Sequence, residues 1–429
     1  MKFFRKIHLW LSVPFGIIVT LVCFSGAMLI FEPEVTRSAR SEVYYVSEVK
    51  DEPLPMGELM EGVKATLPDS VSITGVTVFS DKSRTYQVNL SKPRRASLFV
   101  DQYTGEITGR YERGSFFSTM FKLHRWLLDS ANPHGDGVKT GKLLVGISTL
   151  VFVIALVTGV VIWWPRARKN FRRSISIPFS QGWKGFWKGL HVAGGMYALV
   201  FVLAMALTGL TWSFDWYRSA FYAVCGVEHT PRNMQQAPSA GKPKGDDAAP
   251  EREGGRRGNR GGNGRDGSEE SRDGGREGRE GGRRGEGRGE GRGEGRGEGG
   301  GRHRSEFGRW QQVYDELAAR YPDAPQITVG NETATVTLGN SGNVRASDRF
   351  EFSRRSGEIT PSASYADANG ADRLRGWIYS VHTGALGGMF TRIVWFLGAL
   401  LGASLPLTGY YIWIRHLRRS KKEAKIQKK

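Results

Sequence analysis

Four of the eight histidines in this sequence of 429 residues occupy matched positions. His8 and His191, in KIHLW and GLHVAGG, stand at the start of two apolar segments, whereas His124 and His382, in FKLHRWLLD and YSVHTGALGG, stand shortly before two others. Two imidazoles on facing helices are the axial ligands that the iron of a b-type haem requires. We therefore take these four histidines as candidate ligands of haem iron.

A simpler interpretation treats each histidine as an amphipathic residue near lipid headgroups. That interpretation is the better one for a single histidine, but ionisable groups at membrane depth usually face a functional interior, and here they form two matched pairs. Zinc is a weaker alternative, because it takes further Cys, His or carboxylate ligands that these segments do not offer nearby. His134, in the loop NPHGDG, is an alternative ligand, and the remaining histidines fit solvated roles: His229, His303 and His416.

The segments that position these histidines lack any Asp, Glu, Lys or Arg over the roughly 20 residues that span a bilayer. We predict an α-helical membrane protein, a bundle of four transmembrane helices at 9–31, 142–165, 190–214 and 391–414. A cleaved signal peptide is the alternative for the first helix, but its apolar run is too long and no small-x-small site ends it.

Basic residues predict the orientation of the helices. The loop 166–188 has seven Lys or Arg and no acidic residue, and the tail 415–429 has eight against Glu423 alone. Short basic segments stay cytoplasmic, so both termini and this loop are predicted to be inside. The net charge of +19 then reflects topology in large part and requires no nucleic acid. The two cysteines, Cys23 and Cys225, are poorly placed to pair.

The two halves of the chain share one plan. Gly26 follows His8 at the same interval at which Gly209 follows His191. The strings TGVVIWWPR and TGYYIWIRH end the second and fourth apolar segments, and DQYTGEITG is echoed by SRRSGEIT. Three matches in the same order predict two tandem repeats.

Each repeat is expected to carry a small α+β unit and an amphipathic helix outside the membrane. Alternating strands and glycine turns predict the α+β units, and helical apolar spacing predicts the helices at the outer interface. Between the repeats, a Gly/Arg/Glu-rich insert has almost no apolar residues and is predicted to be disordered. The expected segments are 41–113 and 305–365 for the units, 116–129 and 374–386 for the helices, and 231–304 for the insert.

This topology pairs His8 with His191 near the cytoplasmic side and His124 with His382 near the outside, so two haems would be stacked across the bilayer. Small residues beside the inner pair, at Gly16, Gly194 and Gly195, would let a porphyrin approach the backbone or would simply pack helices. Four further pairs are expected to serve helix packing first: Ser25–Gly26, Thr158–Gly159, Thr208–Gly209 and Thr408–Gly409.

The chain resembles the PepSY-associated transmembrane helix family in four ordered groups of strings: KIHLWLSVPFG, LHRWLL with TGVVIWWPR, LHVAGGMYALVF with LTGLTWSFDWY, and VHTGALGG with LPLTGYYIWIR. The outer units, with TGEI and SGEI, look like PepSY domains. The resemblance covers nearly all of the chain except the insert. It implies a Gram-negative inner-membrane protein connected with iron uptake, in which two b-type haems are ligated by His8, His124, His191 and His382.

Some members of that family look like reductases for ferric siderophores, so the resemblance implies a membrane oxidoreductase of the ferric-chelate reductase type. The acceptor would be a ferric siderophore or another ferric chelate in the periplasm. No glycine-rich dinucleotide fingerprint is evident at a strand–helix junction, so a cytoplasmic flavoprotein reductase or quinol would donate electrons. Two other functions stay open: a non-redox PepSY membrane protein that binds or regulates a periplasmic partner, and a small-solute transporter with histidine-mediated proton coupling. Inverted repeats would favour transport, but these halves repeat in parallel.

Overall fold

A computed structural model describes residues 1–93, 96–129, 140–228, 307–339 and 342–427, with side chains up to Ser420. Four helical segments are long and apolar enough to cross a membrane: Lys2–Ile30, Thr140–Lys169, Phe179–Ser213 and Ala385–Ser420. They overlap the four predicted spans, and the chain is therefore a multi-pass membrane protein. The predicted insert at 231–304 and three of the other histidines, His134, His229 and His303, lie outside the described residues.

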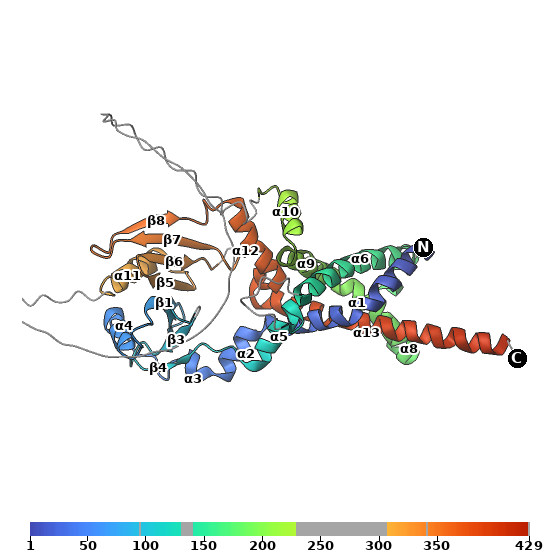
Figure 1. The fold of residues 1–429 in the computed structure, drawn as a ribbon, viewed down its shortest axis with the longest axis horizontal. Helices are drawn as coiled ribbons and strands as arrows, with labels where there is room; N and C mark the ends of the chain where they lie inside the picture. The colour runs from blue at the N-terminus through green and yellow to red at the C-terminus, as the bar shows by residue number, and fades with distance from the viewer. Residues whose placement is uncertain (94–95, 130–139, 229–306, 340–341, 428–429) are drawn as a thin grey trace, which may run out of the picture. The chain divides into compact units, whose positions relative to one another are not determined.

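The bundle consists of α1 (Lys2–Ile30), α6 (Thr140–Lys169), α9 (Gly195–Ser213) and α13 (Gly388–Gln427). Helix α1 packs against α6 and α13, and α9 packs against the same two helices, so the four lie side by side (Figure 1). A core shared by α6, α9 and α13 includes Leu156, Ala198, Val202 and Leu405. Helices α1, α6 and α13 all extend beyond the predicted spans, because charged residues end the apolar run without ending the helix.

Short helices flank the bundle. They are α2 (Glu32–Ala39), α3 (Ser41–Tyr44), α5 (Ser115–Trp126), α7 (Phe171–Ser174), η1 (Phe179–Gln181), α8 (Gly182–Gly189), η2 (Leu190–Gly194), α10 (Asp215–Val224), α12 (Gly370–Thr383) and η3 (Ala385–Gly387). Helices α5 and α12 are the counterparts of the helices predicted at 116–129 and 374–386. Both end earlier than predicted because the chain turns left-handed, at Leu127 in α5 (φ 52°) and at Gly384 in α12 (φ 71°).

The strands form one eight-stranded antiparallel sheet in the order β4-β3-β2-β1-β5-β6-β7-β8, as Figure 1 shows in part. The first four are β1 (Ile73–Phe79), β2 (Tyr86–Leu90), β3 (Ser97–Val100) and β4 (Ile107–Arg110). The second four are β5 (Gln326–Gly330), β6 (Thr333–Thr337), β7 (Ser347–Phe352) and β8 (Ile359–Ala363). Each group is a meander in which sequential strands are neighbours.

The sheet corrects the expectation of two separate units at 41–113 and 305–365. Strands β1 and β5 pair over five residues on each side, from Gly75 with Gly330 to Phe79 with Gln326. This pairing removes two exposed edges, which would otherwise present unpaired backbone groups. The strands approach closely where the two glycines meet, because a Cβ added to Gly330 would lie 2.5 Å from the carbonyl oxygen of Thr74.

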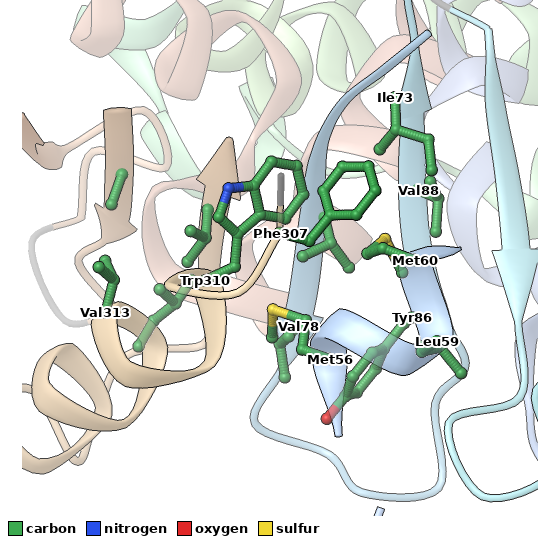
Figure 2. Packing of buried hydrophobic residues seen from close by; sticks show 14 of the residues in the cluster. Met56, Leu59, Met60, Ile73, Val78, Tyr86, Val88, Phe307, Trp310 and Val313 are labelled. Carbon is green, nitrogen blue, oxygen red and sulfur yellow. The ribbon is translucent and has the colours of Figure 1, made fainter. Parts of the chain in front are cut away.

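One hydrophobic core serves both halves of the sheet. Helices α4 (Met56–Ala65) and α11 (Trp310–Arg320) contribute apolar side chains to the same cluster. Figure 2 shows Phe307 and Trp310 beside Met56 and Met60, and all four side chains are almost fully buried. The paired edges and the common core make the eight strands one structural element.

The same order of elements occurs twice: a helix, four strands, a second helix and a membrane helix. The two TGEI and SGEI turns have matching geometry, with φ of 77° at both Gly105 and Gly357. In each, the glycine N–H donates to a carbonyl four residues earlier, at 2.9 Å to Asp101 and 2.8 Å to Ser353. A left-handed residue at this position explains the glycine in both strings.

Candidate functional site: two pairs of histidines

The first pair of histidines lies near the beginnings of α1 and α9. His8 lies in the second turn of α1, and His191 lies in the π-helical turn η2 that leads into α9. Their ring centroids are 6.2 Å apart, and the ring planes meet at 79°. A single π turn within a longer helix is frequent at functional sites, because it changes the direction of one side chain. We call His8 and His191 the terminal pair, since they lie near the chain's N-terminus.

The second pair is formed by the short helices α5 and α12. His124 and His382 have ring centroids 6.0 Å apart and ring planes at 53°. The indole ring of Trp212 lies 5.0 Å from that of His382. We call His124 and His382 the sheet-side pair, because α5 follows β4 and α12 follows β8. The pairing predicted from topology is therefore present in space for all four histidines.

The separation within each pair agrees with two ligands of one metal ion. An imidazole nitrogen binds a first-row metal at about 2.0 Å, and ring bonds of about 1.35 Å put that nitrogen about 1.1 Å from the ring centroid. Two imidazoles on opposite sides of one ion therefore have centroids about 6.2 Å apart. The observed centroid separations of 6.2 and 6.0 Å match that value.

Backbone carbonyl groups orient the terminal pair. The Nδ1–H of His8 donates to the Ala155 carbonyl at 3.0 Å and to the Thr158 hydroxyl at 3.1 Å. The Nδ1–H of His191 donates to the Leu405 carbonyl at 3.1 Å and to the Thr408 hydroxyl at 2.9 Å. The two imidazoles are thus held in the same way, one by α6 and the other by α13.

The sheet-side pair is held by the other two membrane helices. His124 donates from Nδ1 to the Val22 carbonyl of α1 at 2.9 Å. His382 donates from Nδ1 to the Met205 carbonyl of α9 at 2.9 Å and to the Thr208 hydroxyl at 3.1 Å. Each of the four membrane helices therefore holds one histidine.

These bonds assign the tautomer of the imidazoles. A carbonyl can only accept, so Nδ1 carries the proton and Nε2 carries the lone pair. The threonine hydroxyls agree, since that of Thr408 donates its own proton to the Ser404 and Leu405 carbonyls and is left to accept from His191. Among the described residues, no group hydrogen-bonds to Nε2 of any of the four. A carbonyl on Nδ1 and a free Nε2 form the arrangement of metal-binding histidine.

A glycine seats each imidazole against the helix that holds it. A Cβ added to the glycine would meet the histidine Cε1, at 2.7 Å for Gly26 and His124, 3.1 Å for Gly209 and His382, 3.3 Å for Gly409 and His191, and 3.6 Å for Gly159 and His8. The Ser/Thr–Gly pairs, expected to serve general helix packing, therefore accommodate the histidines. This role also explains why His8 and Gly26 have the same spacing as His191 and Gly209.

The sheet-side histidines are neutral. Burial lowers the pKa of His124, and it lowers the pKa of His382 to about 3, with the nearby His124 acting in the same direction. The hydrogen bonds to Val22 and Met205 oppose this effect without reversing it. An uncharged imidazole keeps its lone pair available, as metal ligation requires.

The other small residues near the terminal pair contact side chains. A Cβ at Gly16 would lie 2.6 Å from the hydroxyl of Tyr410, which donates to the Val13 carbonyl at 2.5 Å. A Cβ at Gly195 would lie 3.4 Å from Leu405, and one at Gly194 would lie 3.8 Å from Leu401. These glycines therefore match the helix-packing alternative.

Each pair offers two imidazole nitrogens that could act as ligands. In the described parts of the chain, no group of three or more His, Cys, Asp or Glu side chains could hold a metal ion. The described histidine outside the pairs, His416, is exposed. A flat macrocycle fits such a set, because it supplies four ligands of its own and needs only the two axial positions.

Two ion pairs connect α2 to the segment before α5 and to α13. Arg113, just before α5, contacts Glu32 through Nε and Nη2 at 2.5 and 2.6 Å. Arg392, in α13, contacts Glu34 at 2.5 and 2.6 Å and also donates to the Ile30 carbonyl. Both are two-point contacts of the kind that fix geometry as well as charge.

The fold and the two histidine pairs define a class of multi-pass membrane proteins whose helices hold paired imidazoles. More specifically, the chain belongs to the PepSY-associated TM region family, whose model matches residues 5–416. No curated protein matches the chain. The match includes all four histidines of the two pairs.

Proposed function

We propose that this protein binds two b-type haems, one between His8 and His191 and one between His124 and His382, and carries electrons across the membrane to a ferric chelate. The observation that supports this most directly is the separation of the rings, 6.2 and 6.0 Å, together with an Nε2 on every ring that no described residue hydrogen-bonds. Structural zinc needs about four ligands, whereas haem needs these two.

Haem iron exchanges single electrons between its ferric and ferrous states, and that is the chemistry it would supply when bound. The chain fixes the distance between the two sites through its helices. Val22, which holds His124, follows His8 along α1 at the same interval at which Met205, which holds His382, follows His191. At about 1.5 Å per residue this interval is about 21 Å, within a hydrocarbon core of about 30 Å.

The proposed orientation follows from charge. Basic residues in loop 166–188 and at both termini stay cytoplasmic, which makes the terminal pair the cytoplasmic one and the sheet periplasmic. We infer an inner-membrane location, and we interpret the repeated element order as a tandem duplication with two PepSY-like halves. Because both halves enter the membrane in the same direction, they are parallel repeats and do not have the inverted symmetry of many transporters.

The proposed reaction transfers electrons and no atoms from the donor to the ferric chelate. A quinol, or the reduced flavin of a cytoplasmic reductase, would give up two electrons and release its protons to water, and two periplasmic Fe(III) chelates would each gain one electron and become Fe(II). No atom is transferred to the chelate in that step. Hard oxygen chelators hold Fe(II) less tightly than Fe(III), so reduction would release the iron.

The test is a dithionite-reduced minus oxidised spectrum of the purified protein with haem quantification. We expect two b-type haems per chain, and His8→Ala and His382→Ala should each remove one. His416→Ala, which changes an exposed histidine, is the matched control and should keep both. Absence of reducible Soret and α bands in the intact protein would rule out the proposal, and loss of both haems from either single change would argue against the pairing. Reoxidation of the reduced protein by ferric chelates then tests the acceptor.

A further inference from the structure

Each sheet-side histidine has an arginine–aromatic pair one helical turn before it. Phe121 lies three residues before His124 on α5, and the guanidinium carbon of Arg113 is 4.2 Å from its ring centroid. Tyr379 lies three residues before His382 on α12, and the guanidinium carbon of Arg345 is 3.8 Å from its ring centroid. Residues three apart on a helix share a face, so both arginines lie beside the sheet-side pair.

The two arginines differ in charge environment. Arg113 is neutralised by its two-point contact with Glu32. Arg345 is exposed, and within the described residues no carboxylate forms an ion pair with it. Arg345 therefore places an uncompensated positive charge on the surface beside α12, as the exposed Arg125 does on α5 next to His124.

The loop that carries Arg345 is fixed to α12. The backbone N–H of Val344 donates to the Ser380 hydroxyl at 3.0 Å. The Asn343 amide donates to the Tyr365 hydroxyl at 2.9 Å, and its oxygen accepts from the Arg345 N–H at 3.1 Å. Gly376 makes the contact possible, since a Cβ there would lie 2.4 Å from the Asn343 side chain. The arginine is thus held in position before any ligand arrives.

We infer that Arg345, stacked on Tyr379, is the docking residue for the electron acceptor and selects anionic metal chelates. A guanidinium offers several N–H donors in one plane, which matches paired oxygens of carboxylate or similar groups. Stacking on an aromatic ring leaves the edge of the guanidinium free to donate. This inference rests on the proposed function, and it specifies which surface the acceptor meets and which sign of charge the acceptor carries.

Two measurements on the intact, haem-loaded protein test the inference. In the first, reduced protein is mixed with an anionic chelate, ferric EDTA, or with a cationic one, ferric ferrioxamine B, and haem reoxidation is followed. Arg345→Gln should slow reoxidation by ferric EDTA about five-fold at low salt, which is the effect of one unit charge at contact in water. The loss should shrink as salt screens the charge. Reoxidation by the cationic chelate should not slow.

Arg345→Lys keeps the charge and should retain most of the salt dependence. Arg355→Gln removes an exposed arginine from the turn between β7 and β8 and is the matched control, with no expected effect. Equal rates for wild type, Arg345→Gln and Arg355→Gln with the anionic chelate would overturn the inference.

The second measurement is equilibrium dialysis with gallium EDTA, which has the charge of the ferric chelate and is not reduced under these conditions. Binding weakened about five-fold by Arg345→Gln, and unchanged by Arg355→Gln, supports the docking role, and binding that is absent or independent of Arg345 overturns it. A wild-type protein that no ferric chelate reoxidises would count against the proposed function alone. The gallium result would still decide the docking site.

Discussion

Replacing the four seating glycines by alanine, one at a time, should displace the four histidines to graded extents. The same chemical change is made at equivalent places, so the differences come from the space beside each ring. A Cβ would lie 2.7 Å from the His124 Cε1 at Gly26, and 3.6 Å from the His8 Cε1 at Gly159. The other two positions, Gly209 at 3.1 Å and Gly409 at 3.3 Å, lie between these limits.

The magnitudes follow from those distances. Nonbonded carbon atoms prefer a separation of about 3.5 Å or more, so Gly26→Ala must move the His124 ring by roughly 0.8 Å. Metal–ligand bonds tolerate only about 0.2 Å of error, so the sheet-side haem should be lost. Overpacking costs about 1–3 kcal/mol, and the helix propensity of alanine offsets about 1 kcal/mol of that. The Cβ of Gly159→Ala would make an ordinary van der Waals contact with His8, so this variant should keep both haems and be stabilised by up to about 1 kcal/mol.

The assay is haem content per chain in the purified variants, together with their thermal unfolding. We expect haem loss to decrease in the order Gly26, Gly209, Gly409, with the first two acting on the sheet-side site and the third on the terminal site, and we expect no loss in Gly159→Ala. Equal loss in all four variants, or greatest loss in Gly159→Ala, would show that the glycines do not act through the histidine seats.

Two further predictions concern stability. Burial raises the pKa of Glu34, but the hydrogen bonds and charge of Arg392 outweigh it and hold that pKa below the usual 4.5, so the unfolded state binds the proton more readily. The stabilisation by this ion pair is therefore complete above pH 4.5 and is lost as the pH falls through the lowered pKa. The Tm difference between wild type and Glu34→Gln should accordingly vanish in acid. A Tm difference that does not depend on pH would contradict this. Gly330→Ala should destabilise the protein by about 1–3 kcal/mol, because its Cβ would lie 2.5 Å from the Thr74 carbonyl oxygen. The control is Gly62→Ala, whose Cβ meets nothing within 4 Å and which should not destabilise the protein. Equal denaturation midpoints for the two variants would refute the close approach of β1 and β5.

The pairing of the histidines could be predicted from the sequence because it depends on topology alone. Apolar length gives the number of spans, and their order puts His8 level with His191 and His124 level with His382. The groups that hold the rings could not be predicted in this way. Ala155 and Leu405 act through backbone carbonyls, which leave no signature in residue type. Only the adjacent Ser/Thr–Gly pairs were visible, and their general use in helix packing concealed the specific role.

For the eight-stranded sheet, the sequence predicts local structure but not the contact between its two halves. Local alternation and glycine turns predict an α+β unit in each half, since those signals lie within a few residues, but they do not reveal every strand: β1, β4 and β8 show no regular alternation of buried and exposed residues. The pairing of β1 with β5 joins two strands that are far apart in the chain, and nothing in either strand specifies the other. Gly75 and Gly330 are the sequence signal of this strand pairing, but a lone glycine in a strand has several explanations.

The repeated spacing of histidine and glycine links the two sites through single helices. On α1, His8 serves the terminal pair, while Val22 and Gly26 receive His124 of the sheet-side pair. The intervals from His8 to Val22 and to Gly26 are both close to whole numbers of helical turns, at about 3.6 residues per turn, so these positions return to nearly the same face. The face of α1 that presents one imidazole therefore also accepts the other, and α9 repeats the arrangement with His191 and His382. If the number of residues between the histidine and the glycine changed, the helix would turn one of the two positions away from the bundle core. The histidine and the distant glycine on the same helix therefore depend on each other's position.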